Sequence, residues 1–188
     1  MPNARQFTIL YGDIVRTSAM IAQFGDLAVL NAIRKLLERL EVFQKAHRGQ
    51  FVKSLGDSFL MIFDEVSDAL SLAIDIQRSL QVDYIEVAPP RIRGAYDSVI
   101  RLRVGLHTGP VSLIETVYGR EILGQAVVIA ARITAYADPG TIVMTKAVER
   151  LLSGKQRAAL TLTEVSASIK HEGILQISKV AVPTETKP

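Results

Sequence analysis

The chain has 188 residues, a formal net charge of +3 and a sequence pI near 9.3. Hydrophobic residues make up 48% and charged residues 22% of the chain, which excludes an intrinsically disordered protein and supports one domain with a sizeable core. The positive charge is too small to indicate a nucleic-acid partner, and the lack of cysteine excludes disulfides and thiolate metal sites.

The N-terminal residues contain no apolar stretch of the signal-peptide type. No window reaches the ~18 continuous apolar residues that a membrane-spanning helix needs. We therefore expect a soluble, cytoplasmic protein with no membrane partner.

Hydrophobic periodicity gives the order of elements in the first part of the chain. Residues 6–13 form a mostly apolar strand, and residues 14–25 form a loop and the start of a helix, with Thr17 and Ser18 as candidate N-caps. A helix follows over residues 26–46. Its predicted apolar stripe consists of Leu30, Ile33, Leu37 and Leu40.

Residues 51–63 read as two strands around a tight turn that contains Gly56 and Asp57. The acidic residue at the tip is either ordinary turn chemistry or one half of a metal site whose other half is Asp13 at the end of the first strand. Two strand-end carboxylates repel each other, so a divalent cation is the natural reason to bring them together.

The second part of the chain begins with a helix over residues 66–81 and a long irregular stretch over residues 83–98, which we expect to form a loop or a protruding arm. Residues 100–107 alternate as a strand, and residues 108–110 should turn the chain. The remaining predicted elements are strands over 111–117 and 120–123, a helix over 124–137, a strand over 141–145, a short helix over 146–152 and two edge strands over 160–182.

This order of elements predicts an α+β fold. Its first part is a ferredoxin-like βαββαβ core with extra strands after it. Such a core implies an antiparallel sheet with its helices on one face.

Four stretches of the chain have to be considered together. They are Tyr-Gly-Asp-Ile-Val at 11–15, Val-Lys-Ser-Leu-Gly-Asp at 52–57, Arg-Val-Gly-Leu-His-Thr-Gly-Pro-Val at 103–111, and Glu-Ile-Leu-Gly-Gln-Ala-Val-Val-Ile-Ala-Ala-Arg-Ile at 121–133. In this order and spacing the set resembles the class III nucleotidyl cyclase catalytic domain. Each motif alone is weak, whereas the four in register are specific, and the resemblance covers about residues 7–152.

The resemblance implies a reaction and an assembly. Family members convert a nucleoside triphosphate to a 3′,5′-cyclic nucleoside monophosphate and pyrophosphate, at sites formed between two head-to-tail protomers of a dimer. We therefore expect a homodimer with composite active sites. Residues 6–152 would be the catalytic domain, and residues 153–188 would be C-terminal strands and a tail of the same domain.

The resemblance also assigns residues by position. Asp13 and Asp57 would hold a pair of Mg²⁺ or Mn²⁺ ions with help from the Ile14 carbonyl. Arg132 would stabilise the pentacovalent phosphorus, a task that suits a delocalised and always charged guanidinium. Without the other motifs, a helix cap, a turn and a surface arginine would be the commoner interpretations of these residues.

One position departs from the family pattern. The family usually has an asparagine four residues before the arginine, where this chain has Val128, which cannot hydrogen-bond a ribose. The alternative to an active enzyme is therefore a degenerate cyclase domain that binds nucleotide or a partner without chemistry. A ferredoxin-like RNA-binding module ranks last, because the hairpin lacks interleaved exposed aromatic residues.

Lys53 and Glu121 match the positions that contact the base, and this pair disfavours guanine within the family. A lysine donor and a glutamate acceptor fit adenine, uracil and cytosine equally well. Phe51 lies two residues before Lys53 and should share its face, unless it packs in the core of the dimer.

An aromatic ring beside the base would shorten the pocket and favour a single-ring pyrimidine. We therefore place UTP ahead of CTP and slightly ahead of ATP. The chain also resembles the compact, soluble pyrimidine cyclases of bacterial antiphage defence, whose product is a second messenger. Adenylate cyclase is the alternative.

Overall fold

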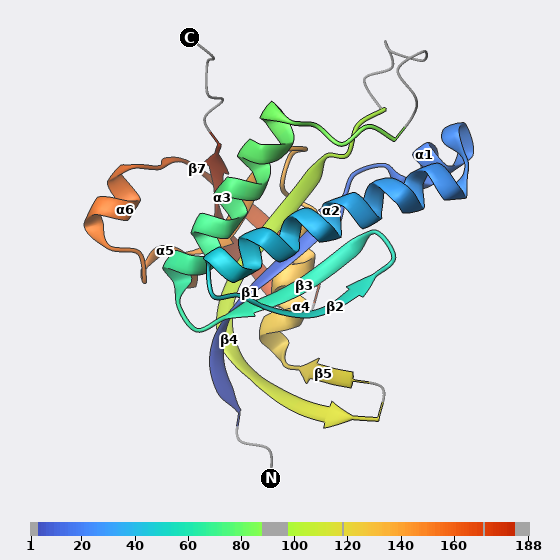
Figure 1. Ribbon diagram of the computed structural model, residues 1–188. Coiled ribbons are helices and arrows are strands. Elements are labelled where there is room, and N and C mark those ends of the chain that lie inside the picture. The colour runs from blue at the N-terminus through green and yellow to red at the C-terminus, as the bar shows by residue number, and fades with distance from the viewer. Residues whose placement is uncertain (1–3, 88–97, 118, 171, 183–188) are drawn as a thin grey trace.

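The computed structural model of the protein describes residues 4–87, 98–117, 119–170 and 172–182. The strands are β1 (Arg5–Ile14), β2 (Gln50–Leu55), β3 (Ser58–Phe63), β4 (Leu102–Thr116), β5 (Gly119–Leu123), β6 (Ile142–Thr145), β7 (Thr161–Ile169) and β8 (Gly173–Ala181). The helices are α1 (Thr17–Phe24), α2 (Asp26–Ala46), α3 (Val66–Val82), α4 (Gln125–Thr134), α5 (Lys146–Glu149) and α6 (Gly154–Ala158). The strands form one sheet in the order β2-β3-β1-β4-β6-β8-β7, and β5 pairs with the far end of β4 (Figure 1).

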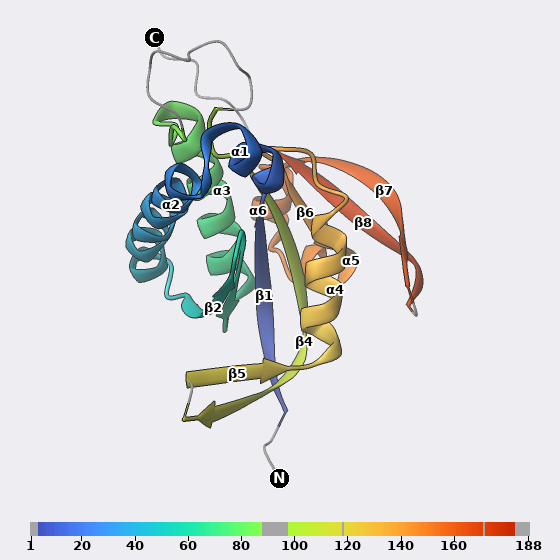
Figure 2. The ribbon, with the colours of Figure 1, turned by 90° about the vertical axis from the view of Figure 1, so that its right-hand side faces the viewer.

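The order β2-β3-β1-β4, with every neighbouring pair antiparallel, is that of a ferredoxin-like βαββαβ core. The predicted α+β class is confirmed. The expectation of an antiparallel sheet with helices on one face was wrong beyond this core. The pair β4–β6 is parallel, because the chain crosses over through α4 between these two strands, and α4 covers the opposite face (Figure 2).

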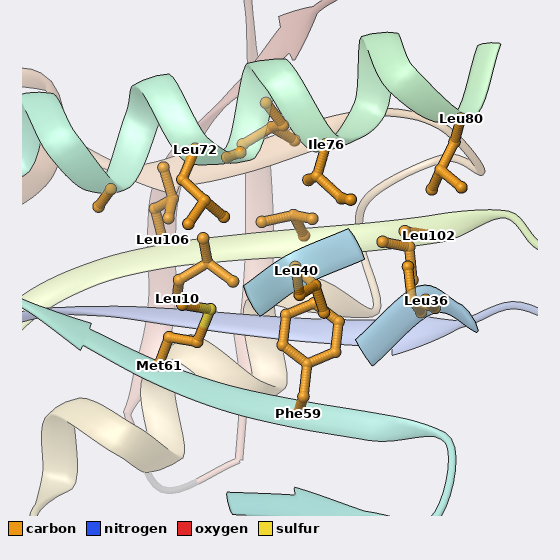
Figure 3. Packing of buried hydrophobic residues seen from close by; sticks show 14 of the residues in the cluster. Leu10, Leu36, Leu40, Phe59, Met61, Leu72, Ile76, Leu80, Leu102 and Leu106 are labelled. Atoms are coloured by element: carbon orange, nitrogen blue, oxygen red, sulfur yellow. The ribbon is translucent and has the colours of Figure 1, made fainter. Parts of the chain in front are cut away.

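Two hydrophobic layers therefore flank the central strands. The helices α2 and α3 pack on one face, where Leu72 and Ile76 of α3 lie over Leu10 and Leu106 of the sheet (Figure 3). On the other face, Ile9 and residues of β3 and β4 pack against α4. Because side chains alternate along a strand, each residue of β1 is committed to one of the two layers.

The predicted start and apolar stripe of the first helical region were partly wrong. In α2 the buried residues are Val29, Ala32, Leu36 and Leu40, and only the last of these belonged to the predicted stripe. Leu30 is 62% exposed, because α2 carries apolar residues on more than one side and the stripe that packs is displaced around the helix axis. Neither Thr17 nor Ser18 caps α1; Arg16 holds the cap position at φ 62°.

The predicted turn at residues 108–110 does not exist, because β4 continues through it to Thr116. The glycines of this strand serve packing instead. A Cβ on Gly105 would lie 2.6 Å from the Ala130 carbonyl oxygen, and one on Gly109 would lie 2.8 Å from the Ala126 Cβ. Both glycines let α4 approach the sheet closely.

The remaining differences lie at the end of the chain and in its long loop. Of the two predicted edge strands, only β7 is an edge, since β8 lies between β6 and β7. The short helix α6 was not predicted, although Ser153 and Gln156 form its capping box. Of the expected loop over 83–98, residues 88–97 lie outside the described residues.

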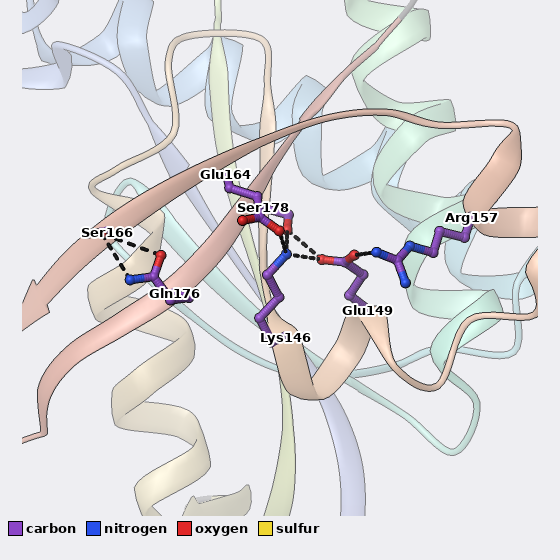
Figure 4. A network of polar contacts seen from close by, with 7 residues as sticks. All are labelled: Lys146, Glu149, Arg157, Glu164, Ser166, Gln176 and Ser178. Carbon is purple, nitrogen blue, oxygen red and sulfur yellow. Dashed lines mark hydrogen bonds and ion pairs between the residues drawn. The ribbon is translucent and has the colours of Figure 1, made fainter.

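A polar network ties α5, α6, β7 and β8 together (Figure 4). The Glu149 side chain, 3% exposed, pairs with Lys146 at 2.7 Å and with Arg157 at 2.6 Å, and it accepts a hydrogen bond of 2.5 Å from the Ser178 hydroxyl. Burial alone would raise the pKa of Glu149. Hydrogen bonds from Lys146 and Ser178, together with the two positive charges, outweigh burial and lower this pKa below its usual 4.5.

We predict that Glu149→Gln lowers stability at neutral pH by about 1–3 kcal/mol, because Lys146 and Ser178 lose their charged partner. The folded-state pKa of Glu149 lies below the unfolded value of 4.5, so its contribution is complete above that value and is lost as the pH falls through the folded pKa. Urea unfolding between pH 7 and pH 3 should therefore show a smaller acid-induced loss in the variant. Parallel pH profiles for the two proteins would contradict this role.

Candidate active site

Asp13 and Asp57 lie at the same end of the sheet. Asp13 is the second-last residue of β1 and lies directly opposite Ser58 of β3 on one side and Arg103 of β4 on the other. The Ile14 N–H donates to the Asp57 carbonyl oxygen at 2.9 Å, which fastens the β2–β3 turn to the end of β1. Strand pairing thus places two acidic residues that are far apart in sequence at the same edge of the sheet.

The two carboxylates have different surroundings. The Asp13 side chain is 22% exposed and forms an ion pair with Arg103. The Asp57 side chain is half-buried, and within the described parts of the chain it has neither a hydrogen bond nor an ion pair. The site therefore holds one neutralised and one uncompensated acidic group.

The oxygen atoms at this edge fit a divalent metal pair. Two carboxylates and a carbonyl are the hard oxygen ligands that Mg²⁺ and Mn²⁺ prefer. The Ile14 carbonyl accepts a hydrogen bond of 3.2 Å from the Thr17 hydroxyl and keeps a second lone pair. No group of three or more acidic or histidine side chains occurs among the described residues, so a triphosphate and water would have to complete the coordination.

Lys53 of β2 and Glu121 of β5 are neighbours. The lysine ammonium lies 2.5 Å from the glutamate Oε2, and the two side chains are 30% and 49% exposed. The structure thus brings together the two residues predicted to contact the base, although they are 68 positions apart in sequence.

Phe51 does not share a face with Lys53, and that prediction was wrong. A β-bulge falls between these two residues, so that Phe51 lies opposite Met61 while Lys53 lies opposite Leu60. Met61 belongs to the core under α2 and α3, and Leu60 belongs to the α4 side. The extra residue of the bulge reverses the alternation, and Phe51 packs into the protomer's own core. It therefore cannot narrow a base pocket beside Lys53.

Arg132 and Val128 lie one turn apart on α4, and both side chains are partly buried. The Arg132 guanidinium donates to the Lys170 carbonyl oxygen, directly after the end of β7. Within the described residues no hydrogen bond or ion pair joins Arg132 to Asp13 or Asp57. One protomer therefore keeps the two predicted carboxylates apart from the predicted phosphate-stabilising arginine.

Sequence reasoning overlooked the role of Arg103. The alternation along the predicted strand at residues 100–107 already placed Arg103 on the face opposite the apolar residues. What the sequence did not contain was the register of β1 against β4, which sets Arg103 opposite Asp13. The same applies to Tyr11, whose hydroxyl donates to Ser58 at 2.9 Å beside Asp13.

The family model described as "Adenylate and Guanylate cyclase catalytic domain" matches residues 1–177 of the chain. The chain belongs to this family. Among the helices of the described residues, none combines the length and the apolar character needed to cross a membrane.

The cyclase domain is similar to a receptor-type adenylate cyclase of Trypanosoma brucei brucei, with 28% identity over 197 residues. The match covers 86% of the chain but only 16% of that relative, so the cyclase domain spans about a sixth of its length.

Solved structures of the family share the fold. The adenylyl cyclase CyaB from P. aeruginosa has a TM-score of 0.79 at 16% identity, and the match covers 99% of this chain and 98% of that one. An adenylate/guanylate cyclase/hydrolase from Silicibacter pomeroyi has a TM-score of 0.74 at 26% identity, covering 96% of this chain and 98% of that one.

We predict that Phe51→Ala destabilises the cyclase domain by about 2–3 kcal/mol, because it leaves a cavity in the core, and leaves the ratio of ATP to UTP turnover unchanged. Ile174→Ala is the matched control, since Ile174 is 71% exposed and its truncation should cost less than about 0.5 kcal/mol. Thermal unfolding and product analysis measure the two effects. A shift in base preference in Phe51→Ala would show that the Phe51 side chain does lie beside the bound base.

Proposed function

We propose that this cyclase domain is an adenylate cyclase, which converts ATP to 3′,5′-cyclic AMP and pyrophosphate. The observation that carries the proposal is the Lys53–Glu121 pair, on the same chain as the Asp13–Asp57 edge. The lysine can donate to N1 of adenine and the glutamate can accept from its 6-amino group. Because uracil and cytosine fit this pair equally well, the pair supports a cyclase that reads one of these three bases, and the choice of ATP among them comes from the adenylate cyclase relative. The family match supports the reaction class, and the receptor-type relative supports ATP by its name.

Phe51 no longer favours a pyrimidine. That preference assumed an aromatic ring beside Lys53, and Phe51 lies in the core on the other side of the sheet. A role in antiviral defence rests on the separate likeness to the pyrimidine cyclases of antiphage defence alone. Uridylate cyclase is therefore an outcome that the assay can return, and ATP is the substrate that we propose.

The carboxylates of Asp13 and Asp57 and the Ile14 carbonyl would hold the pair of Mg²⁺ or Mn²⁺ ions. When bound, these ions offset the charge of the triphosphate and lower the pKa of the 3′-hydroxyl. The Arg132 guanidinium would offset the charge that develops on the α-phosphate. Val128 gives the ribose no hydrogen bond, so the base contacts have to orient the sugar and we expect slow turnover.

We further propose that the active unit is a head-to-tail homodimer. Asp13 and Asp57 would meet Lys53, Glu121 and Arg132 of the partner subunit. The separation of Arg132 from the carboxylates within one protomer supports this arrangement. So does the β4–β5 arm, which carries three exposed apolar side chains near Glu121. They are Ile114, Val117 and Leu123, exposed by 49%, 93% and 80%.

In this proposal residues 6–152 are the catalytic domain, and residues 153–188 are the C-terminal strands and tail of the same domain. The pairing of β8 with β6 supports that division, because it joins the C-terminal part to the central sheet.

Incubation with each of the four ribonucleoside triphosphates and Mn²⁺ tests the reaction. We expect cyclic AMP and pyrophosphate from ATP, and a loss of at least a hundredfold in Asp57→Ala with an unchanged circular dichroism melt. Formation of cyclic UMP from UTP, with no cyclic product from the other nucleotides, would show that the substrate is UTP and not ATP. No cyclic product from any nucleotide would leave a domain that binds nucleotide without chemistry.

Mixing two inactive variants tests the composite site. Asp57→Ala and Arg132→Ala each destroy both sites of their own homodimer, but a mixed dimer regains one intact site. Random pairing makes half of the dimers mixed, so the mixture should recover about a quarter of the wild-type rate. Absence of recovery, with mixed dimers shown by cross-linking, would place both residues in the same protomer's site.

A further inference from the structure

The Asp13–Arg103 ion pair lies at the centre of the proposed metal site. The two residues are direct cross-strand partners in β1 and β4, and both face the α4 side of the sheet. Their side chains are 22% and 30% exposed, so the pair is shielded from bulk water more than a surface salt bridge is. A permanent positive charge therefore stands beside a proposed metal ligand.

The Asp13–Arg103 contact uses only one nitrogen of the guanidinium and only one oxygen of the carboxylate. Arg103 reaches the Asp13 Oδ2 atom through one terminal nitrogen, while its Nε is buried and has no hydrogen-bond partner. A structural arginine–carboxylate pair usually forms two parallel hydrogen bonds and leaves no buried donor unpaired. The geometry thus leaves the ion pair weaker than a bidentate one and easier to separate.

We propose that Arg103 competes with the divalent cation for Asp13, and so sets the metal concentration at which the site fills. This inference rests on the proposed function, because it takes Asp13 as a metal ligand. Arg103 opposes the metal in two ways: it occupies Oδ2, and it adds a positive charge next to the incoming ion. Arg103 is a positioning residue that acts through Asp13. Asp57, which has no cationic partner within the described residues, binds its share of the metal without this competition.

Titration of the nucleotide-free protein with Mn²⁺, followed by the electron paramagnetic resonance signal of the free ion, tests the proposal without any reaction. We expect Arg103→Gln to bind Mn²⁺ at least tenfold more tightly than the wild type. Arg103→Met keeps the unbranched stem that packs below the surface and should show the same gain. Arg103→Lys keeps the charge and should not show it.

The control is Arg5→Gln, which removes an arginine from an ion pair with Asp64 at the other end of β1 and changes the net charge equally. Its Mn²⁺ affinity should match that of the wild type. Unchanged or weaker binding in both neutral Arg103 variants, or an equal gain in Arg103→Lys, would overturn the competition. If Asp13→Ala leaves Mn²⁺ binding unaltered in wild-type and Arg103→Gln backgrounds, the proposed metal site itself fails.

Discussion

The pairing of β1 with both β3 and β4 is the constraint on which the rest of the site depends. Its register sets Asp13 between Ser58 and Arg103, and the hydrogen bond from Ile14 to the Asp57 carbonyl fixes the turn of the hairpin beside it. β1 is apolar and buried on both faces along most of its length, so a slip by one residue would exchange the side chains of its two core layers and disrupt the packing of both. The energy of the hydrophobic core therefore holds the two acidic side chains at one edge.

Much of this arrangement was predictable from the sequence. The order of strands and helices follows from local periodicity, and the helix over residues 26–46 was predicted with the bounds of α2. Asp13 follows an apolar segment and Asp57 lies in a turn-forming segment, and the ends of both segments can be recognised from the sequence alone. Lys53 and Glu121 came from the family resemblance, and the structure places them in contact.

The parts that were not predictable depend on relations between strands. The bulge at Phe51–Lys53 adds one residue to a strand whose sequence still alternates, and only the partner strand shows where the alternation breaks. The role of Arg103 depends on the register of β1 against β4, and the burial of Val29 instead of Leu30 depends on how α2 is rotated against the sheet. Single-strand periodicity contains none of these quantities.

The salt bridge between Lys53 and Glu121 has a consequence for selectivity. Each of these side chains already satisfies the other, so under the proposed function a binding base would gain only the difference in free energy between two sets of partners. A base edge that contacted the ammonium but not the carboxylate would leave the Glu121 charge without a partner, and the proposed site would reject it for that reason. Under the proposed function, the rejection of guanine is then a matter of exchange at a preformed ionic contact.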